Sequence, residues 1–440
     1  MFKRFVLSNT GVKLAQKELD FISRDTLDKI LESIIGVTPE RPTLAAYSQS
    51  IRNLITMANL GKVVMSSIPD TGVFVAEQMH NGIPYIEAQG NLIKAASNSF
   101  NSSQKKEYAR LLGVGTDNVM GLAYSRLGTD QHVAGRVAGA ISATTNYYFK
   151  LNLMDWWDNS FKSALGFVLS NHLAHHTKAS YKKAPIELKN SLKRYGIDEK
   201  DWSTLKSFIK KADDGREYII TPEWMAGNRQ INEVATRFKT YLKDRVDTGI
   251  PTPHALERYA ATLGTKAGTP LGEAVRFLMQ FKQFPITYWM RGRKDYYQGS
   301  PKTLSTMLIL STIGGYASIA ANKMLNGEDI PEFDMSILQA SMLKGGGLGL
   351  YGDFIFGQYN RYGHNIYQAM ASPAVSSGAD VASIWSDIAE GKTDDATKKA
   401  EMLAHRMTPF RNLFYLAPAL RGGGVSDEWV DRNLNAKNIK

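Results

Sequence analysis

Three histidines near the middle of the chain are the first candidates for chemistry. His172, His175 and His176 follow the spacing i, i+3 and i+4, so a helix would place His172 and His176 on one face, close enough to share a metal ion. The HExxH pattern of zinc proteases is absent, because no glutamate follows His172. We interpret the trio as a polar helix face and predict no metal site, with metal binding as the alternative.

A glycine-rich segment formally matches a cofactor-binding pattern. Gly347, Gly349 and Gly352 have the G-x-G-x-x-G spacing of dinucleotide-binding proteins. That site needs a strand before the glycines, whereas residues 336–346 have a helical pattern. We therefore interpret the glycines as a flexible break or a place of close backbone approach, and we predict no cofactor.

The remaining chemistry-bearing side chains form no catalytic motif. The chain has no cysteine, which excludes thiol nucleophiles, disulfides and thiolate metal sites. Carboxylates such as Glu18, Asp20, Glu40 and Glu87 occur outside any known acid–base pattern, and the serines show no G-x-S-x-G elbow. We predict that the protein is not an enzyme and name no catalytic residue.

A basic stretch at residues 177–211 accounts for more than half of the net charge. It carries ten basic and four acidic residues, a net +6 of the +11 for the whole chain, with Tyr181, Tyr195 and Trp202 interleaved. Cations next to aromatic rings suit phosphate contact and base stacking, although a solvated helix face explains the same pattern. The candidate contacts for DNA or anionic lipid are Lys182, Lys183, Lys189, Lys193 and Arg194.

Residues 303–322 form a charge-free run of 20 residues. As a helix this run is long enough to span a bilayer, but serines, threonines and glycines dilute its hydrophobicity. A buried helix of a water-soluble fold and a segment that enters a membrane after a conformational change both remain open. The candidate membrane or intersubunit contacts are Leu308, Ile309, Leu310, Ile313 and Ile319.

A second amphipathic segment lies at residues 156–173. Its apolar residues recur at helical spacing, and Lys162 is expected on another face, as in a helix that lies at a membrane interface. Packing in the core is the other interpretation. The candidate membrane or intersubunit contacts in this segment are Trp156, Trp157 and Phe161.

These candidates are expected on helices throughout. With 43% hydrophobic and 22% charged residues the chain has the composition of a folded protein, and residues 12–35 predict an amphipathic helix or helix pair. The pairs Thr221-Pro222, Thr252-Pro253, Thr269-Pro270 and Ser300-Pro301 predict helix starts, and residues 217–221 are the best candidate for a strand.

The expected fold is therefore mainly α, an elongated multi-helix protein with little β-structure. The run Phe5–Leu7 is too short for the apolar region of a secretory signal. Changes in composition suggest three regions: a helical region at 1–150, a helical region with the basic stretch at 151–300, and an apolar, glycine-rich helical region at 301–440 that is a candidate for membrane or oligomer contact.

Four segments resemble one family. LMDWWDNSFKSALGFVLSNHLA at 153–174, RYGIDEKDW at 194–202, the long segment DRVDTGIPTPHALERYAATLGTKAGTPLGEAVRFLMQFKQFP at 244–285 and TPFRNLFYLAPALR at 408–421 are similar to the C-terminal part of large internal virion proteins of short-tailed bacteriophages and related prophages. The resemblance covers about residues 150–425 and transfers no catalytic residue.

This resemblance implies a protein that is packaged inside the capsid and ejected with the genome. Copies of it would assemble with other ejection proteins and with portal or tail proteins into a conduit across the host envelope, contacting double-stranded DNA without sequence preference and, in the periplasm and inner membrane, the host lipid. Relatives with an N-terminal peptidoglycan-cleaving domain exist, and we identify none here. A static portal-associated or tail-adaptor protein, or a peptidoglycan hydrolase, are the alternatives.

Overall fold

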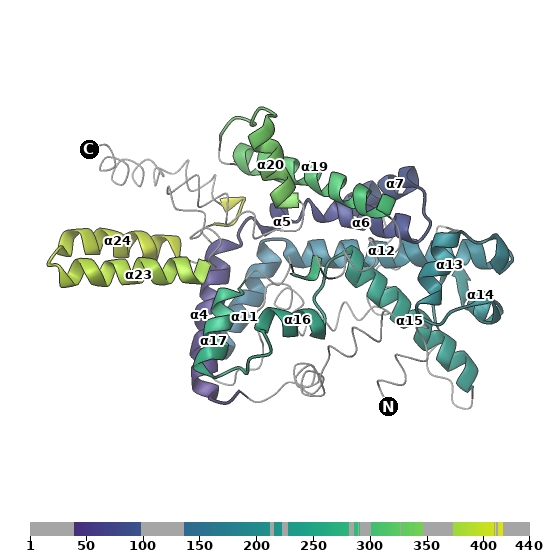
Figure 1. Cartoon of the computed structure of the whole chain (residues 1–440), viewed down its shortest axis with the longest axis horizontal. Helices are drawn as coiled ribbons and strands as arrows, with labels where there is room; N and C mark the ends of the chain where they lie inside the picture. Colours follow the sequence, from purple (N-terminus) through teal and green to yellow (C-terminus); the bar gives the residue numbers. More distant parts are fainter. Residues whose placement is uncertain are drawn as a thin grey trace.

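The computed structural model is built almost entirely of helices, which confirms the mainly α prediction (Figure 1). It describes residues 39–97, 136–211, 215–221, 228–280, 286–288, 290, 301–325, 327–345, 373–408, 410 and 412–416. The predicted helix at 12–35 and the glycines at 347–352 lie outside the described residues.

The elements follow one another in this order: α4 (Pro42–Asn59), α5 (Val63–Ser66), α6 (Asp70–His80), α7 (Tyr85–Ala96), α11 (Arg136–Leu151), α12 (Met154–Thr177), the 3-10 helix η1 (Tyr181–Lys183), α13 (Ile186–Lys193), the 3-10 helix η2 (Glu199–Asp201), α14 (Trp202–Ser207), β1 (Ile209–Lys211), β2 (Glu217–Ile219), α15 (Arg229–Gly249), α16 (Ala255–Thr262), α17 (Pro270–Leu278), α19 (Pro301–Leu325), α20 (Met335–Leu343), α23 (Pro373–Ala389) and α24 (Thr393–Arg406).

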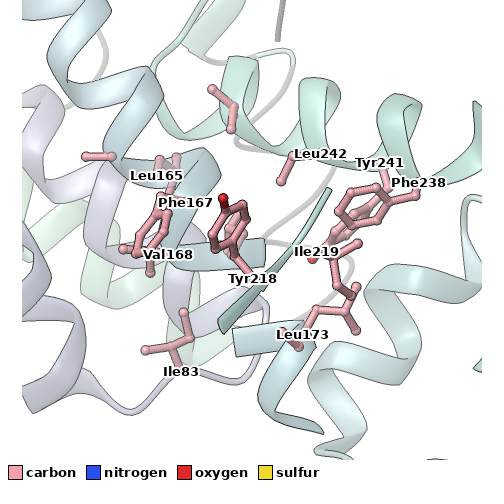
Figure 2. Close-up of a cluster of buried hydrophobic side chains, with 14 of the residues drawn as sticks. Ile83, Leu165, Phe167, Val168, Leu173, Tyr218, Ile219, Phe238, Tyr241 and Leu242 are labelled. Atoms are coloured by element: carbon pink, nitrogen blue, oxygen red, sulfur yellow. The ribbon is translucent and has the colours of Figure 1, made fainter. Parts of the chain in front are cut away.

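Helix α12 is the centre of the main core. Its 24 residues are buried on almost every side, as expected for a helix with apolar residues all round. Side chains from α12, β2 and α15 meet around Phe167, Tyr218 and Phe238 (Figure 2). Helices α6, α7, α13 and α14 add apolar residues to the same cluster.

The predicted strand at 217–221 is confirmed as part of a small antiparallel pair. Strand β2 pairs with β1 so that Lys210 lies opposite Tyr218. Ser170 of α12 attaches this pair to the core, because its hydroxyl donates to the carbonyl of Ile219 over 2.8 Å and accepts from the amide of the same residue over 2.7 Å. The pair therefore serves as a cover for α12.

Residues 244–280 comprise the end of α15, helix α16 and helix α17, with a turn between α15 and α16. The carboxylate of Asp247 at the end of α15 lies 2.9 Å from His254 Nε2, 3.7 Å from the ammonium of Lys243 and 3.9 Å from that of Lys162. Burial raises the pKa of Asp247, but the hydrogen bond from His254 and the charges of the two lysines outweigh it and lower this pKa to about 2. The contacts of Asp247 thus give this part of the segment a structural role.

Two of the four predicted helix starts agree with the structure. Thr269 caps α17 by accepting a hydrogen bond from the amide of Gly272 over 2.9 Å, and α19 begins at Pro301. The exception is Thr252-Pro253, because α16 begins two residues later, where Glu257 accepts from the amide of His254. Pro222 lies outside the described residues.

The hydrophobic clusters run across the proposed borders at 150 and 300. Phe74 of α6 and Phe161 of α12 belong to one cluster, and Leu413 joins residues of α4 and α11 in another. Helix α19 packs on α6, and Asn412 donates to the carbonyl of Ala58 over 2.6 Å. Among the described residues, the three regions share cores.

A buried ion pair joins α6 to α15. The guanidinium of Arg245 donates from Nε to Glu77 Oε1 and from Nη2 to Glu77 Oε2, both over 2.7 Å. Asn81 donates to Glu77 Oε1 over 2.7 Å, and its own oxygen accepts from Ser191 of α13 and Tyr241 of α15. This network fixes three helices relative to one another.

Replacing Glu77 by Gln should lower the free energy of unfolding by about 3–5 kcal/mol, because it leaves the guanidinium of Arg245 buried without its counter-charge. Chemical denaturation followed by circular dichroism measures this change. The matched control is Glu233→Gln, which removes the exposed pair with Arg229 and should leave the denaturation midpoint unchanged. Equal midpoints for the two variants would contradict the assigned role of the buried pair.

Candidate functional site

Helix α19 lies on the outside of the main body, antiparallel to α6 (Figure 1). Its 25 residues give a length of roughly 37 Å. Among the described residues, Lys302–Leu325 is the one stretch long and apolar enough to cross a membrane, and 28% of its apolar window is buried. Helix α19 is therefore the candidate functional element.

The side chains that α19 turns toward the body are mostly small or polar. We call this stripe the inner face; it comprises the buried residues Thr303, Met307, Ser311, Gly314 and Ser318, and Gly315 is buried beside it near Ser341 of α20. Met307 is the single large apolar side chain that α19 buries completely among its described residues, which contributes about 1.5–3 kcal/mol. The hydroxyl of Ser318 is buried without a hydrogen-bond partner in the described structure, which weakens this contact.

Glycines allow the inner face to approach α6 closely. A Cβ atom at Gly72 of α6 would lie 2.6 Å from the backbone nitrogen of Ser311, and a Cβ at Gly314 would lie 2.7 Å from Pro69 Cα. Neither glycine can be replaced unless the two helices move apart. The contact therefore depends on close backbone packing more than on buried apolar area.

Large apolar side chains point away from the body. Ile309, Ile313 and Met324 are 60%, 59% and 62% exposed, and we call the stripe that they form the outer face. Because Met307, Leu308 and Leu310 pack inward, α19 carries large apolar residues on both sides, whereas a surface helix of a water-soluble protein turns them mainly inward. Exposed apolar residues continue on the following loop and α20, at Ile330, Phe333, Met335 and Met342.

The structure separates the five candidates of this helix. Ile309 and Ile313 lie together on the outer face. Leu308 packs against a small cluster formed by Val73, Ala76, Tyr288 and Met307, and Leu310 packs against the main core. Ile319 is half-buried.

The three candidates at the start of α12 differ in how far they are buried. Trp157 and Phe161 are core residues, and their stacked rings have centres 4.3 Å apart. In this conformation they are therefore too buried to contact a membrane or another subunit. Trp156 is 39% exposed. The expectation that Lys162 lies off the apolar side is wrong, because its ammonium is buried toward Asp247. Apolar elements surround α12 on all sides, which the helical spacing did not reveal.

The basic candidates lie on one compact unit formed by η1 and α13. Lys182, Lys183, Lys193 and Arg194 are exposed, whereas Lys189 is half-buried. The ammonium of Lys189 donates to the carbonyl of Lys182 over 3.3 Å and lies 5.9 Å from the centre of the Tyr181 ring. The structure thus brings these cations to one end of the molecule, as Figure 1 shows for α13.

The aromatic residues of the basic stretch make contacts within the protein. Trp202 is 7% exposed, and its indole nitrogen donates to the carbonyl of Ala179 over 2.9 Å. The hydroxyl of Tyr195 donates to Asp244 over 2.5 Å, and Tyr181 packs edge-on against Trp202. The buried ring of Trp202 is therefore not available for base stacking in this conformation, whereas most of the cations of the unit are exposed.

The histidines lie on α12 as predicted, with the rings of His172 and His176 4.6 Å apart. Burial, together with the nearby His176, lowers the pKa of His172 to about 4, although a hydrogen bond with the backbone of Asn81 acts in the opposite direction. No cluster of three or more potential metal ligands occurs in the described part of the chain. The imidazole of His172 can bind or release a proton.

Sequence reasoning missed the buried pair of Glu77 and Arg245. These residues are 168 positions apart, and no local pattern connects them. One signal was available, because Arg245 follows Phe238, Tyr241 and Leu242 on the apolar stripe of α15. A charged residue at a core position indicates a buried partner.

A scan against protein-family models, a search of curated proteins and a search of solved structures each return no match to this chain.

Protonation of His172 should destabilise the fold in acid. Its folded pKa of about 4 is below the ordinary value of 6.5, so the unfolded state binds the proton more tightly between these values. Stability should fall by about 3 kcal/mol as the pH drops from 6.5 to 4. Denaturation of His172→Gln over this range should show a smaller loss than the wild type, whereas His175→Gln, which alters an exposed ring, should not. Identical pH profiles for all three proteins would contradict this assignment.

Proposed function

We propose that this protein is an internal virion protein of the short-tailed phage type, which leaves the capsid with the genome and assembles into a conduit across the host envelope. The observation that carries the proposal is the exposure of Ile309 and Ile313 on α19, a long apolar helix whose fully buried stripe holds mainly small and polar residues. A helix with this distribution is suited to lipid, because there large aliphatic side chains face the acyl chains and small residues face other helices.

Two further features support this proposal. The first is the resemblance of segments 153–174, 194–202, 244–285 and 408–421 to such proteins. The second is the exposed cation group on η1 and α13, which suits the DNA backbone without reading its sequence. In the proposed arrangement, α19 contacts the host membrane and the cation group faces DNA in a conduit made of several copies.

The charges at the two ends of α19 also suit insertion across a bilayer. Arg291, Arg293 and Lys294 precede the helix in sequence, and Lys302 lies at its start. Glu328, Asp329, Glu332 and Asp334 follow it. Basic residues stay preferentially on the cytoplasmic side of a membrane, so the proposed orientation has the start of α19 at that side.

Replacing Ile313 by Asp tests the membrane role. Ile313 lies near the centre of the apolar run and is 59% exposed, so a charge there should leave folding intact but oppose insertion by about 3–4 kcal/mol. Flotation with vesicles of phosphatidylethanolamine and phosphatidylglycerol should show at least a 100-fold weaker association.

The matched control is Ile388→Asp on α23, away from α19, where the isoleucine is 47% exposed. This variant should float as the wild type does. Equal flotation of all three proteins would overturn the membrane role of α19.

Neutralising the cation group tests the DNA contact. Changing Lys182, Lys183, Lys189, Lys193 and Arg194 to Gln should weaken non-specific binding to duplex DNA. The slope of log K against log salt concentration should fall by about 0.9 for each cation that contacts a phosphate. Fluorescence anisotropy over a salt series measures both changes, with Lys94→Gln/Lys398→Gln as a control on other surfaces. An unchanged slope would remove this surface from the proposed conduit lining.

A further inference from the structure

The contact between α19 and α6 has the features of a reversible attachment. Small residues line both sides, namely Gly72 and Ala76 on α6 and Ser311 and Gly314 on α19. The apolar cluster at this contact has four buried members, Val73, Ala76, Tyr288 and Met307, and is separate from the main core.

The main core does not depend on α19. The cluster around α12 is closed by α6, α7, α13, α14, β2 and α15, and α19 contributes to it only the half-buried Leu310. The buried ion pair of Glu77 and Arg245 and the Asn81 network also lie among α6, α13 and α15. Detachment of α19 therefore leaves the principal stabilising contacts of the body in place.

Two half-buried polar side chains of α19 form hydrogen bonds within the helix itself. The hydroxyl of Thr312 donates to the carbonyl of Leu308 over 2.7 Å, and Asn322 donates to the carbonyl of Ser318 over 2.9 Å. The contact of Ser311 with the Tyr288 hydroxyl is long, at 3.4 Å. Leaving α6 thus preserves the bonds of Thr312 and Asn322.

We propose that α19 is a stored membrane helix, held on α5 and α6 by the glycine contact and released as an intact helix when a bilayer takes over its apolar surface. This inference rests on the proposed function and specifies its regulation: the same contact that keeps the chain water-soluble sets how readily it enters lipid. The body remains folded during the transfer.

Gly72→Ala loosens this attachment without changing α19. The added methyl group meets the backbone of Ser311, so α19 must move away from α6. In a background with Met307→Cys, whose side chain is buried at the contact, a water-soluble maleimide should label the thiol at least several-fold faster. Flotation with the vesicles described above should rise in parallel. The natural absence of cysteine makes the labelled position unique.

Gly90→Ala is the matched control. Gly90 lies in the neighbouring helix α7 with no atom within 4 Å of an added methyl group, so labelling and flotation should stay at the wild-type level. An unchanged labelling rate in a folded Gly72→Ala protein would overturn the proposal.

A disulfide provides a test that does not require a destabilised variant. Gly72 faces Ser311 and Pro69 faces Gly314, so the antiparallel register places Ala76 opposite Met307. The variant Ala76→Cys/Met307→Cys should lose at least 10-fold in flotation when oxidised and recover it on reduction, with each single-cysteine variant as a control.

The outcomes separate this proposal from the function on which it rests. Flotation of the oxidised protein at the level of the reduced protein would overturn the release of α19 while leaving a membrane role intact. Failure of the wild type itself to float would overturn the membrane role. Loss of the cooperative unfolding transition of the body on vesicles would overturn transfer of α19 as a separate unit.

Discussion

The buried pair of Glu77 and Arg245 imposes the constraint on which the body of this protein depends. Two charges taken out of water cost several kcal/mol each, and only the two-pronged geometry, with Asn81 completing it, offsets that cost. The geometry requires α6, α13 and α15 to meet at fixed positions. Gly249 allows the end of α15 to lie close to α6, because a Cβ there would be 3.0 Å from Glu77 Cγ. The pair therefore defines a rigid frame around α12.

This frame has a consequence for α19. Helix α6 uses one side for the ion pair and the main core, and its opposite side, with Gly72 and Ala76, is left to carry α19. Because the frame is complete without it, α19 is free to present Ile309 and Ile313 outward. The core that stabilises the body and the surfaces that serve the proposed function therefore lie on different elements. The main core stabilises the body, whereas α19 and the cation group on η1 and α13 provide the surfaces for the proposed function.

Much of the fold was predictable from local patterns. The apolar periodicity and the Thr269-Pro270 cap indicated helices that the structure contains, and residues 217–221 indicated its strand. The candidate surfaces were only partly predictable. Ile309 and Ile313 are exposed as a contact surface requires, whereas the aromatic residues Trp157, Phe161 and Trp202 lie in the core. Amphipathic spacing identifies an apolar face but does not say whether protein, lipid or water covers it.

The sequence by itself determined the helical class, the absence of thiol chemistry, the position of a 20-residue uncharged run and the concentration of positive charge at 177–211. These properties are local, since they depend on composition and on spacing within one or two turns. Only the tertiary structure decided that Lys162 is buried, that Arg245 meets Glu77, and that α19 turns Ser311, Ser318 and its glycines inward. Those outcomes depend on which elements meet from distant parts of the sequence, because burial is a property of the assembled helices and not of any segment alone.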